Sequence, residues 1–473
     1  MKFIAKSISK VVSQETRIPY QYIATFTGSI VVVSTGMLFG WATPSLPQLL
    51  SPDSPIPLSD SDGSWLAVMP CIGAVVGCLA AARIVDKIGR KTTMLLVSPI
   101  YFVSWMMIAY SQSIAVYNWA RLLSGISDGI ALTAFPMYLG EISDSKIRGL
   151  LASSIPVNTV VGFMVVSMIG SCLSIKLTAL VSSTLPILHF VLFSFMPESP
   201  YFLLMKGKPK ESKEMLIKLR GYTDVDEELK RLEKAVEEEN NLETNIWDLF
   251  TVRSNRAAVY IVVCLRGLQQ LCGPMAIMFY TTIIFNESGN SLSAATSTNI
   301  YFALQVICAI ICSFLVDKVG RRPLLALSAL GSCLALAVEG SYFYVRDYTS
   351  IDVTNFSWIP IAALLSYNII FNLGIGTIPV MMLSELFPTN VKAFALCLAD
   401  IYFGVVVIFV SKFFQIMKDS FGMHVPFLAF SFFSAIGLIY IIFCIPETKG
   451  KTLEEIQDYF KGRVNKKDIQ THL

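Results

Sequence analysis

Long apolar blocks separated by short polar segments dominate the hydrophobicity pattern of this chain. Each block is about 20 residues long, enough for an α-helix to cross the ~30 Å hydrocarbon core of a bilayer. None of them shows the alternation that is typical of a membrane β-strand. The pattern therefore predicts an all-α membrane protein with twelve transmembrane helices. The predicted spans cover residues 22–42, 64–84, 92–110, 114–139, 150–172, 175–195, 257–284, 296–316, 324–344, 358–382, 391–416 and 425–445.

A single long charged stretch interrupts this pattern after the sixth span. Within it, residues 209–220 and 224–240 carry apolar positions at helical spacing, which predicts surface helices. The chain thus divides into two halves of six helices each, joined by a helical insert. The predicted parts are an N-terminal segment (1–21), a first half (22–196), a linker (197–256), a second half (257–445) and a tail (446–473).

Two short motifs occur once in each predicted half. Asp86-Lys87-Ile88-Gly89-Arg90-Lys91 follows the second span and Asp317-Lys318-Val319-Gly320-Arg321-Arg322 follows the eighth. Pro197-Glu198-Ser199 ends the first half and Pro446-Glu447-Thr448 ends the second. Duplicated halves in a membrane protein are typical of a transporter that rocks one half against the other.

Charged residues make up 15% of the chain, against 54% hydrophobic residues, and their distribution predicts the orientation. Basic residues concentrate in the loops that lie on one side if both termini are cytoplasmic, as the positive-inside rule requires. The short basic N-terminus has no small-residue cleavage site and predicts a retained signal anchor. The bilayer is therefore the expected partner of these basic residues, and nucleic acid is not.

Charges near the predicted cytoplasmic helix ends could form an inward gate, in which ion pairs close one side and break when it opens. The alternative is that the cations only orient the protein. Isolated exposed pairs contribute about 0–1 kcal/mol, but a network can bias a two-state equilibrium. The candidate gating residues are Asp86, Arg90, Glu141, Arg148, Glu198, Asp317, Arg321, Arg322, Glu385 and Glu447.

Three ionisable residues fall inside apolar spans: Asp128, Arg266 and Asp400. A charge near the bilayer centre is expensive and is by default a functional candidate. One hypothesis pairs Asp128 with Arg266 across the two halves. The alternative is that each faces a water-filled cavity independently.

Several motifs together resemble the sugar porter branch of the major facilitator superfamily over nearly the whole chain. They are the two D-K-x-G-R-[KR] loops, Arg121-Leu122-Leu123-Ser124-Gly125, Glu141 with Arg148-Gly149, Pro197-Glu198-Ser199-Pro200, Gln269-Gln270-Leu271, Glu385-Leu386-Phe387-Pro388 and Pro446-Glu447-Thr448-Lys449-Gly450. Residues 40–47 and the loop that follows are similar to those of the insect facilitated trehalose transporters. The resemblance implies a central sugar site that opens alternately to each side.

The resemblance also implies which residues contact the sugar. Gln269 and Gln270 match the family's glutamine pair, and buried amides suit sugar hydroxyls because they both donate and accept. The alternative for these glutamines is a hydrogen bond between helices. Gln305 stands where the family has Asn, while Phe371 and Asn372 keep an aromatic and a polar side chain in the tenth span.

Other positions depart from the family pattern. Met275, Pro156 and Val380 replace the expected Asn, Gln and Trp, so the site is less polar than in a typical glucose carrier. The expected substrate is a small sugar, either trehalose or a hexose such as glucose. Tyr280 is a lesser candidate for an aromatic residue of the outer gate.

The first span bears on energy coupling. Proton symporters of the family carry Asp after a Phe-Gly-aromatic triplet, whereas Ala42 follows Phe39-Gly40-Trp41 here. The resemblance therefore implies facilitated uniport. A proton-coupled symporter that uses Asp128 or Asp400, and a sugar sensor that does not transport, remain the alternatives.

The remaining motifs are minor. No metal site, cofactor site or catalytic constellation is expected, and the ten cysteines are expected to be small apolar side chains. Asn286 and Asn355 are candidate glycosylation sites. Thr471-His472-Leu473 matches a PDZ ligand, which would bind a PDZ-type partner. The expected location is the plasma membrane.

Overall fold

The computed structural model describes residues 20–52, 54, 56, 58–144, 147–241, 247–288, 292–387, 389–447 and 449, apart from the side chains at 82, 238–241, 248, 313–318, 354, 384–385, 389–390 and 392–393. The predicted signal anchor extends beyond the described residues at its start. The PDZ motif lies outside them, as do the side chains of Asp317 and Glu385.

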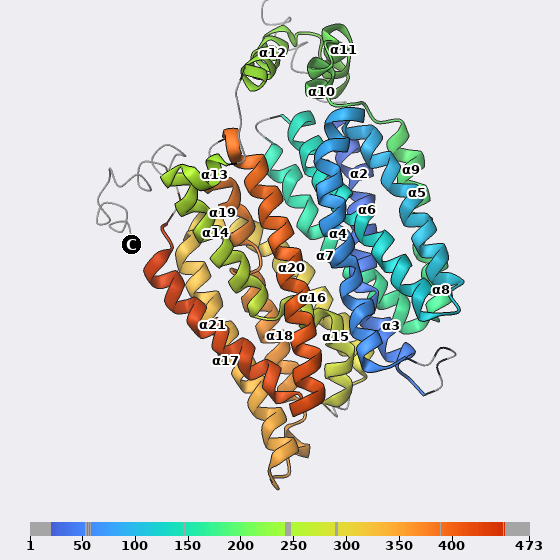
Figure 1. The fold of residues 1–473 in the computed structure, drawn as a ribbon, viewed down its shortest axis with the longest axis vertical. Helices are drawn as coiled ribbons and strands as arrows, with labels where there is room; N and C mark the ends of the chain where they lie inside the picture. The colour runs from blue at the N-terminus through green and yellow to red at the C-terminus, as the bar shows by residue number, and fades with distance from the viewer. Residues whose placement is uncertain are drawn as a thin grey trace, which may run out of the picture.

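Long α-helices make up the described chain (Figure 1). The first part contains α2 (Tyr20–Gly40), α3 (Ala42–Leu49), α4 (Asp60–Ile88), α5 (Arg90–Ala109), α6 (Ile114–Ile142), α7 (Arg148–Cys172), α8 (Ile175–Ser182) and α9 (Thr184–Ser194). A second group contains α10 (Pro200–Met205), α11 (Pro209–Arg220), α12 (Asp226–Asn241) and α13 (Asp248–Thr251). The last part contains α14 (Arg253–Leu271), α15 (Pro274–Glu287), α16 (Ala294–Val319), α17 (Arg321–Tyr348), η1 (Thr354–Phe356), α18 (Ile359–Asn372), α19 (Ile378–Leu386), α20 (Thr389–Phe421) and α21 (His424–Cys444).

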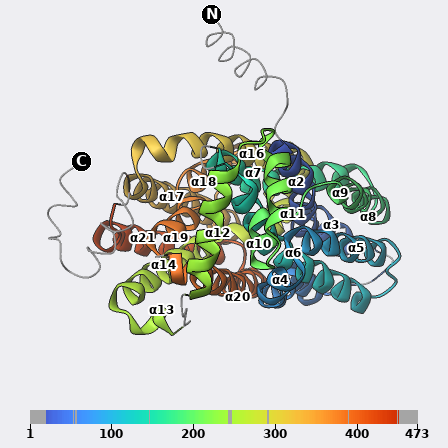
Figure 2. The ribbon, with the colours of Figure 1, turned by 90° about the horizontal axis from the view of Figure 1, so that it is seen from above.

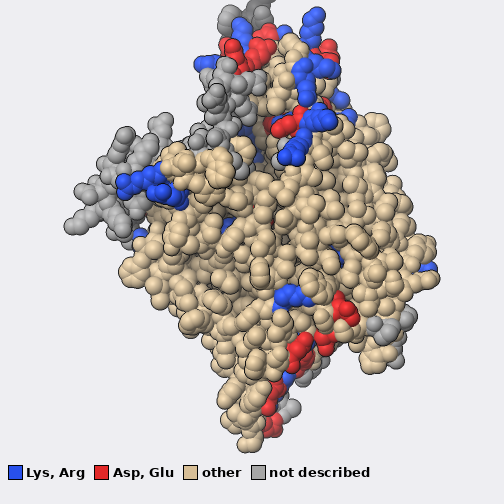
Figure 3. All heavy atoms as spheres, in the orientation of Figure 1, with Lys and Arg blue, Asp and Glu red and all other residues tan. Residues whose placement is uncertain are grey.

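Eleven of the described helical segments are long and apolar enough to cross a membrane. The predicted tenth span is the exception, because it is divided into α18 and the short helix α19. Charged side chains gather at the end that carries α10–α12 and in a strip nearer the opposite end, with a charge-poor belt between them (Figure 3). This belt has the character of a surface that faces lipid.

The helices pack as two bundles. We call α2–α9 the N-terminal bundle and α14–α21 the C-terminal bundle; α4 packs on α6 in the first, and α17 packs on α21 in the second. Viewed from above, the blue to teal helices lie on one side and the yellow to red helices on the other (Figure 2). Contacts between the bundles involve α4 with α20, α7 with α16 and α3 with α15.

The helices α10–α12 lie at one end of the molecule, which we call the linker end, and the opposite end is the far end (Figure 1). Arg220 of α11 fastens this group to the N-terminal bundle. Its guanidinium donates to the main-chain oxygen of Ile142 at 2.7 Å and forms an ion pair with Glu228 at 2.6 Å. Lys218 also lies over the Tyr20 ring, 4.7 Å from its centroid. The linker helices are therefore held by the first bundle.

Direct contacts between the bundles gather toward the far end. Thr43 donates to the main-chain oxygen of Met278 at 2.7 Å, and Ser167 donates to Asn299 at 2.7 Å. The Lys412 ammonium donates to Ser64 at 2.6 Å. These residues lie in the halves of their spans remote from α10–α12, so the bundles are closed against each other at the far end.

The helix α4 begins at Asp60, at the far end, which is earlier than the apolar pattern predicts, because a capping box starts it. The Ser59 hydroxyl accepts from the main-chain N–H of Asp62 (3.2 Å), and the Asp62 carboxylate accepts from the main-chain N–H of Ser59 (3.1 Å). Asp62 thus has a local role in starting the helix.

Candidate functional site

Two interrupted helices meet in the middle of the C-terminal bundle. Between α14 and α15, Gly273 adopts φ = +82°, a left-handed conformation that favours glycine, and Pro274 starts the next helix. Between α18 and α19, residues 373–377 form turns. The Tyr367 hydroxyl donates to the main-chain oxygen of Cys272 at 3.0 Å and so ties α18 to the first interruption. Continuous helices were predicted here; the glycines and prolines explain the interruptions.

Gln269 bridges these two interruptions. Its amide nitrogen donates to the main-chain oxygen of Gly376 at 2.7 Å, while its amide oxygen accepts from Arg266 at 3.0 Å. Interrupted membrane helices free main-chain groups that can coordinate a ligand. Hydrogen bonds with Arg266 and with the Gly376 main-chain oxygen thus hold Gln269 beside the freed main-chain groups.

Gln270 and Gln305 retain hydrogen-bonding capacity. Gln270 is only 2% exposed, and its amide oxygen has no hydrogen-bond partner among the described residues. The amide oxygen of Gln305 is likewise without a partner in the described part of the chain. A buried amide without a partner is costly, so these oxygens are suited to accept from a ligand hydroxyl.

Phe371 and Asn372 lie at the second interruption, close to Gly376. A Cβ at Gly376 would be 3.1 Å from the Asn372 Cα and 3.2 Å from the Phe371 ring. The Phe371 ring packs on Tyr367 with centroids 5.4 Å apart, and the Asn372 amide donates to Asn368. The structure therefore brings Gln269, Phe371 and Asn372 together around one helix interruption.

The predicted ion pair between Asp128 and Arg266 is wrong. Arg266 instead forms an ion pair with Asp400 of α20 at 2.6 Å, and its guanidinium carbon lies 4.7 Å from the centroid of the Phe403 ring. The Asp128 carboxylate accepts from the Tyr101 hydroxyl at 2.5 Å. The two residues belong to different bundles, and each finds its partner within its own bundle.

Asp128 belongs to a fully buried group in the N-terminal bundle. The Tyr101 hydroxyl, which donates to it, also contacts the Thr35 hydroxyl at 2.8 Å, so α2, α5 and α6 meet there. One Asp128 oxygen has no hydrogen-bond partner in the described structure. This polar group is enclosed by helices and is 0% exposed at Asp128.

Sequence reasoning missed Arg121 as an intramembrane charge. This residue is fully buried, donates to the main-chain oxygens of Leu38 and Leu66, and lies over the Trp41 ring at 5.1 Å. It therefore joins α6 to α2 and α4. Its position inside an apolar span was the signal, by the same rule that singled out Asp128.

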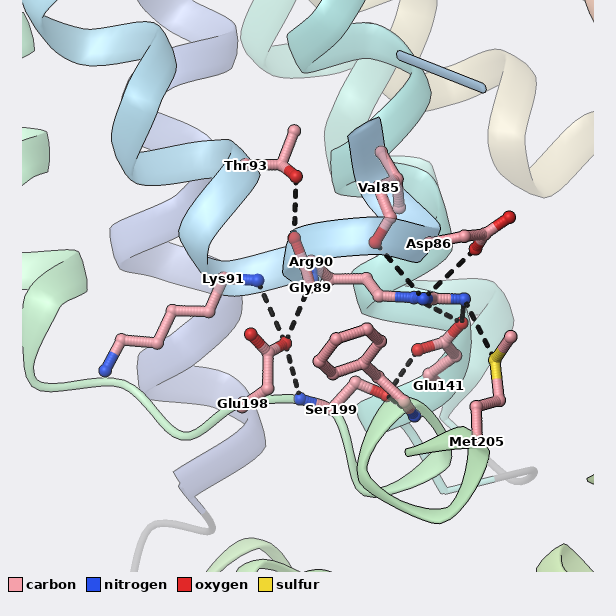
Figure 4. A network of polar contacts seen from close by, with 11 residues as sticks. Val85, Asp86, Gly89, Arg90, Lys91, Thr93, Glu141, Glu198, Ser199 and Met205 are labelled. Carbon is pink, nitrogen blue, oxygen red and sulfur yellow. Dashed lines mark hydrogen bonds and ion pairs between the residues drawn. The ribbon is translucent and has the colours of Figure 1, made fainter. Parts of the chain in front are cut away.

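The first D-K-x-G-R-[KR] loop is held by a network at the linker end of the N-terminal bundle (Figure 4). Glu198 accepts from the main-chain N–H groups of Arg90 (3.1 Å), Lys91 (3.0 Å) and Ser199 (2.9 Å), so it caps the start of α5. The Arg90 side chain, 2% exposed, forms ion pairs with Glu141 at 2.9 Å and Asp86 at 3.2 Å. The Ser199 hydroxyl donates to Glu141.

The second loop repeats this capping geometry. Glu447 accepts from the main-chain N–H groups of Arg321 (3.1 Å) and Arg322 (3.0 Å) at the start of α17, and from that of Lys449 (2.9 Å). Gly89 and Gly320 adopt φ of 98° and 109° in the two turns. The Arg90 side chain also contacts α10, where its guanidinium lies 5.3 Å from the centroid of the Phe202 ring. Arg148 begins α7 and is exposed.

Tyr280 lies in α15 and is 2% exposed. Its ring stacks on Phe414 of α20 with centroids 5.1 Å apart. Asn286 is exposed in the last turn of α15, and Asn355 is exposed within η1, so neither asparagine is enclosed by the fold.

Comparison with known proteins gives the family. The model of the family described as "Sugar (and other) transporter" matches residues 8–460. The chain belongs to this family. A facilitated trehalose transporter of Polypedilum vanderplanki is 32% identical over 94% of this chain and 88% of its own length. A facilitated trehalose transporter of Apis mellifera ligustica is 29% identical over 95% of this chain and 91% of its own length. The chain spans about half of some relatives, such as 52% of the Drosophila mojavensis facilitated trehalose transporter, which is 30% identical over 94% of this chain.

Solved structures of the superfamily share the fold. An inward-open conformation of the xylose transporter XylE from E. coli superposes with a TM-score of 0.77 and 19% identity, covering 93% of this chain and 99% of that one. The proton:xylose symporter XylE bound to 6-bromo-6-deoxy-D-glucose superposes with a TM-score of 0.75 and is 21% identical, over 93% of this chain and 99% of that one. The predicted fold class and the sugar transporter family are therefore confirmed: this family member is a multi-pass, all-α membrane protein that shares the fold of these major facilitator superfamily structures.

In this family member, Lys412 holds the far end closed. Besides its hydrogen bond to Ser64, its ammonium lies 3.8 Å from the centroid of the Trp65 ring. We expect Lys412→Met to widen the separation of α4 and α20 at the far end, because a cation–π contact and a hydrogen bond together contribute about 1–2 kcal/mol. Spin labels at Ser61 and Ser420, in a background without the exposed Cys172 and Cys444, would measure the distance distribution.

The control for this variant is Lys418→Met on the same helix. Lys418 pairs with Asp419, its neighbour in α20, at 3.5 Å and should leave the distribution unchanged. A Lys412→Met distribution identical to that of the unsubstituted protein would show that this contact does not hold the bundles together.

Metal binding has no support in the described part of the molecule. Among the described residues, no group of three or more His, Cys, Asp or Glu side chains is placed to hold a metal ion. The ten cysteines are free, and most are buried or half-buried.

Proposed function

We propose that the protein is a facilitated carrier that moves a small sugar across the membrane by alternating access, without a chemical change in the substrate. The observation that carries this proposal is the central position of Gln269, which bridges two helix interruptions within one of two membrane bundles. Gln270, the next residue of α14, and Gln305 of α16 add amide oxygens without a partner among the described residues. Membership of the sugar transporter family supports it.

The substrate we propose is trehalose or a hexose such as glucose. The most similar relatives reported above are named facilitated trehalose transporters. Phe371 would cover an apolar face of a sugar ring, and Asn372 would contact hydroxyls on the same side.

We propose a plasma-membrane location with both termini and α10–α12 in the cytoplasm. Residues 22–196 and 257–445 would then be the two moving domains, with residues 197–256 as their linker. Since the bundles touch toward the far end, the conformation described would be closed to the outside. In the outward-facing state, charges at the linker end, Glu141 and Arg148 among them, would form the inward gate.

Proton-coupled symport is the second candidate. Asp128 supports it, because a fully buried carboxyl group with one unpartnered oxygen lies inside the N-terminal bundle. Against it stands Ala42, which occupies the place of the family's proton-carrying Asp. A third reading, a sugar sensor, predicts binding without transport.

The test is uptake of labelled trehalose, with labelled glucose in parallel, into proteoliposomes that contain the purified protein and no ion gradient. We expect equilibrating uptake of at least one of them. Uptake that appears only with an imposed proton gradient would replace uniport by symport. Saturable binding without any uptake would replace the carrier by a sensor.

A further inference from the structure

The two residues of the ion pair between Arg266 and Asp400 differ in their exposure. The Arg266 side chain is 7% exposed, whereas the Asp400 side chain is 51% exposed, although both lie inside predicted membrane spans. A half-exposed carboxylate on a membrane helix faces either lipid or a water-filled space, and lipid contact would be strongly unfavourable. The direction in which Asp400 faces therefore decides its role.

Asp400 faces the space between the two bundles. One turn farther along α20, Gly404 approaches α4 so closely that a Cβ there would be 2.8 Å from the Val75 side chain. Residues four apart share a helix face, so Asp400 lies on this face, as Leu79 lies on the facing side of α4. Leu79 is 55% exposed. Neither side chain is therefore fully covered by the facing helix at this level, one turn from the contact toward the linker end.

The same ion pair is connected to the sugar-contacting glutamine. Arg266 donates with one nitrogen to Asp400 and with the other to Gln269, which in turn donates to the Gly376 main-chain oxygen. Arg266 and Gln269 are three residues apart, about 4.5 Å along the helix axis. Asp400 therefore lies about one turn from the glutamine, on the linker side.

Carboxylate chemistry indicates the ligand. A carboxylate has about four acceptor sites and no donor, and Arg266 fixes the orientation of Asp400 through only one of its oxygens. The charges of Arg266 and Asp400 sum to zero, so the pair favours neither an anionic nor a cationic ligand. A neutral molecule with adjacent hydroxyl groups satisfies the remaining acceptors.

We propose that Asp400 forms a second sugar subsite, oriented by Arg266, which accepts hydrogen bonds from hydroxyl groups of a neutral sugar on the linker side of Gln269. This inference rests on the proposed sugar transport. A disaccharide would place one ring at the glutamines and the other at Asp400. Asp400 acts by direct contact, and Arg266 is a positioning residue.

The experiment compares the unsubstituted protein, Asp400→Asn and the double variant Arg266→Gln Asp400→Asn in proteoliposomes. Uptake of trehalose, glucose and a series of monodeoxyglucoses would give KM and kcat for each sugar. Asp419→Asn, at the far end of the same helix, is the matched control. The double variant matters because it leaves no unpaired buried charge if Asp400→Asn alone fails to fold.

We expect about a tenfold rise in KM for the parent sugars in both variants, because hydrogen bonds to a charged group are lost. At least one deoxy sugar, which already lacks the contacting hydroxyl, should show the same KM in the variants and in the unsubstituted protein. An equal shift for every analogue, or recovery of all KM values in the double variant, would overturn the subsite and leave a structural ion pair. Absence of uptake by the unsubstituted protein would instead refute the transport function.

Discussion

Replacement of Gln269 and Gln270 together by alanine is expected to abolish sugar uptake. Gln269 links two helix interruptions, and Gln270 holds a buried amide oxygen without a described partner. The loss of both amides removes donors and acceptors for sugar hydroxyls and releases the Gly376 main-chain oxygen. We expect kcat/KM to fall by at least about 10²-fold, measured as initial uptake rates in proteoliposomes.

The matched control is Gln415→Ala. Gln415 is also a buried glutamine in a membrane helix, but it donates to Asp419 toward the far end of α20. This variant should transport at a rate similar to that of the unsubstituted protein. A double Gln269→Ala Gln270→Ala protein that is folded and retains more than about half of the uptake rate would remove the glutamines from the substrate site.

The second large effect is expected on stability, from Glu198→Ala. The Glu198 carboxylate accepts from the main-chain N–H groups of Arg90 and Lys91 at the start of α5 and from that of Ser199, and alanine leaves all three without this acceptor. Hydrogen bonds to charged groups contribute about 1.5–3 kcal/mol, so we expect a loss of at least about 2–3 kcal/mol. The measurement is the melting temperature of purified protein in detergent, which should fall by several degrees.

The repeated geometry provides an internal replicate. Glu447→Ala should have a similar effect on the C-terminal bundle, because Glu447 accepts from two main-chain N–H groups at the start of α17 and from that of Lys449. Glu211→Ala is the control, since its ion pair with Lys208 is exposed on both sides and contributes little. Unchanged melting temperatures in both the Glu198 and Glu447 variants would contradict a capping role.

Much of the fold could be predicted because its signals are local. The length of each apolar segment predicts a membrane span, and the duplicated loops indicate two bundles whose helices end in a similar way. Glu198 and Glu447 illustrate this, because each follows a proline at the end of its half and caps the helix that begins after a Gly-Arg turn, so the same capping geometry occurs in each bundle. The fold class follows from such repeated, short-range features.

The pairing of intramembrane charges could not be predicted. Arg266 had two carboxylates available, and the choice between Asp128 and Asp400 depends on helix rotation and on which bundle each helix joins. Tertiary packing sets both properties. The interruptions at Gly273 and at residues 373–377 were missed for a related reason, because a glycine within an apolar span is compatible with a continuous helix. The roles of the candidate substrate and gating residues stay predictions.

Polar side-chain contacts add to the packing between the bundles at the far end. The hydrogen bonds Thr43–Met278, Ser167–Asn299 and Lys412–Ser64 hold the far end closed. Each contributes about 1 kcal/mol net, so these three hydrogen bonds alone change the ratio of closed to open far ends by a factor of roughly 100. An equilibrium with so small a bias is within reach of the free energy of binding one millimolar ligand, about 4 kcal/mol. Hydrophobic mismatch costs fractions of a kcal/mol per Å, so the thickness of the surrounding bilayer would also shift the resting distribution of this protein.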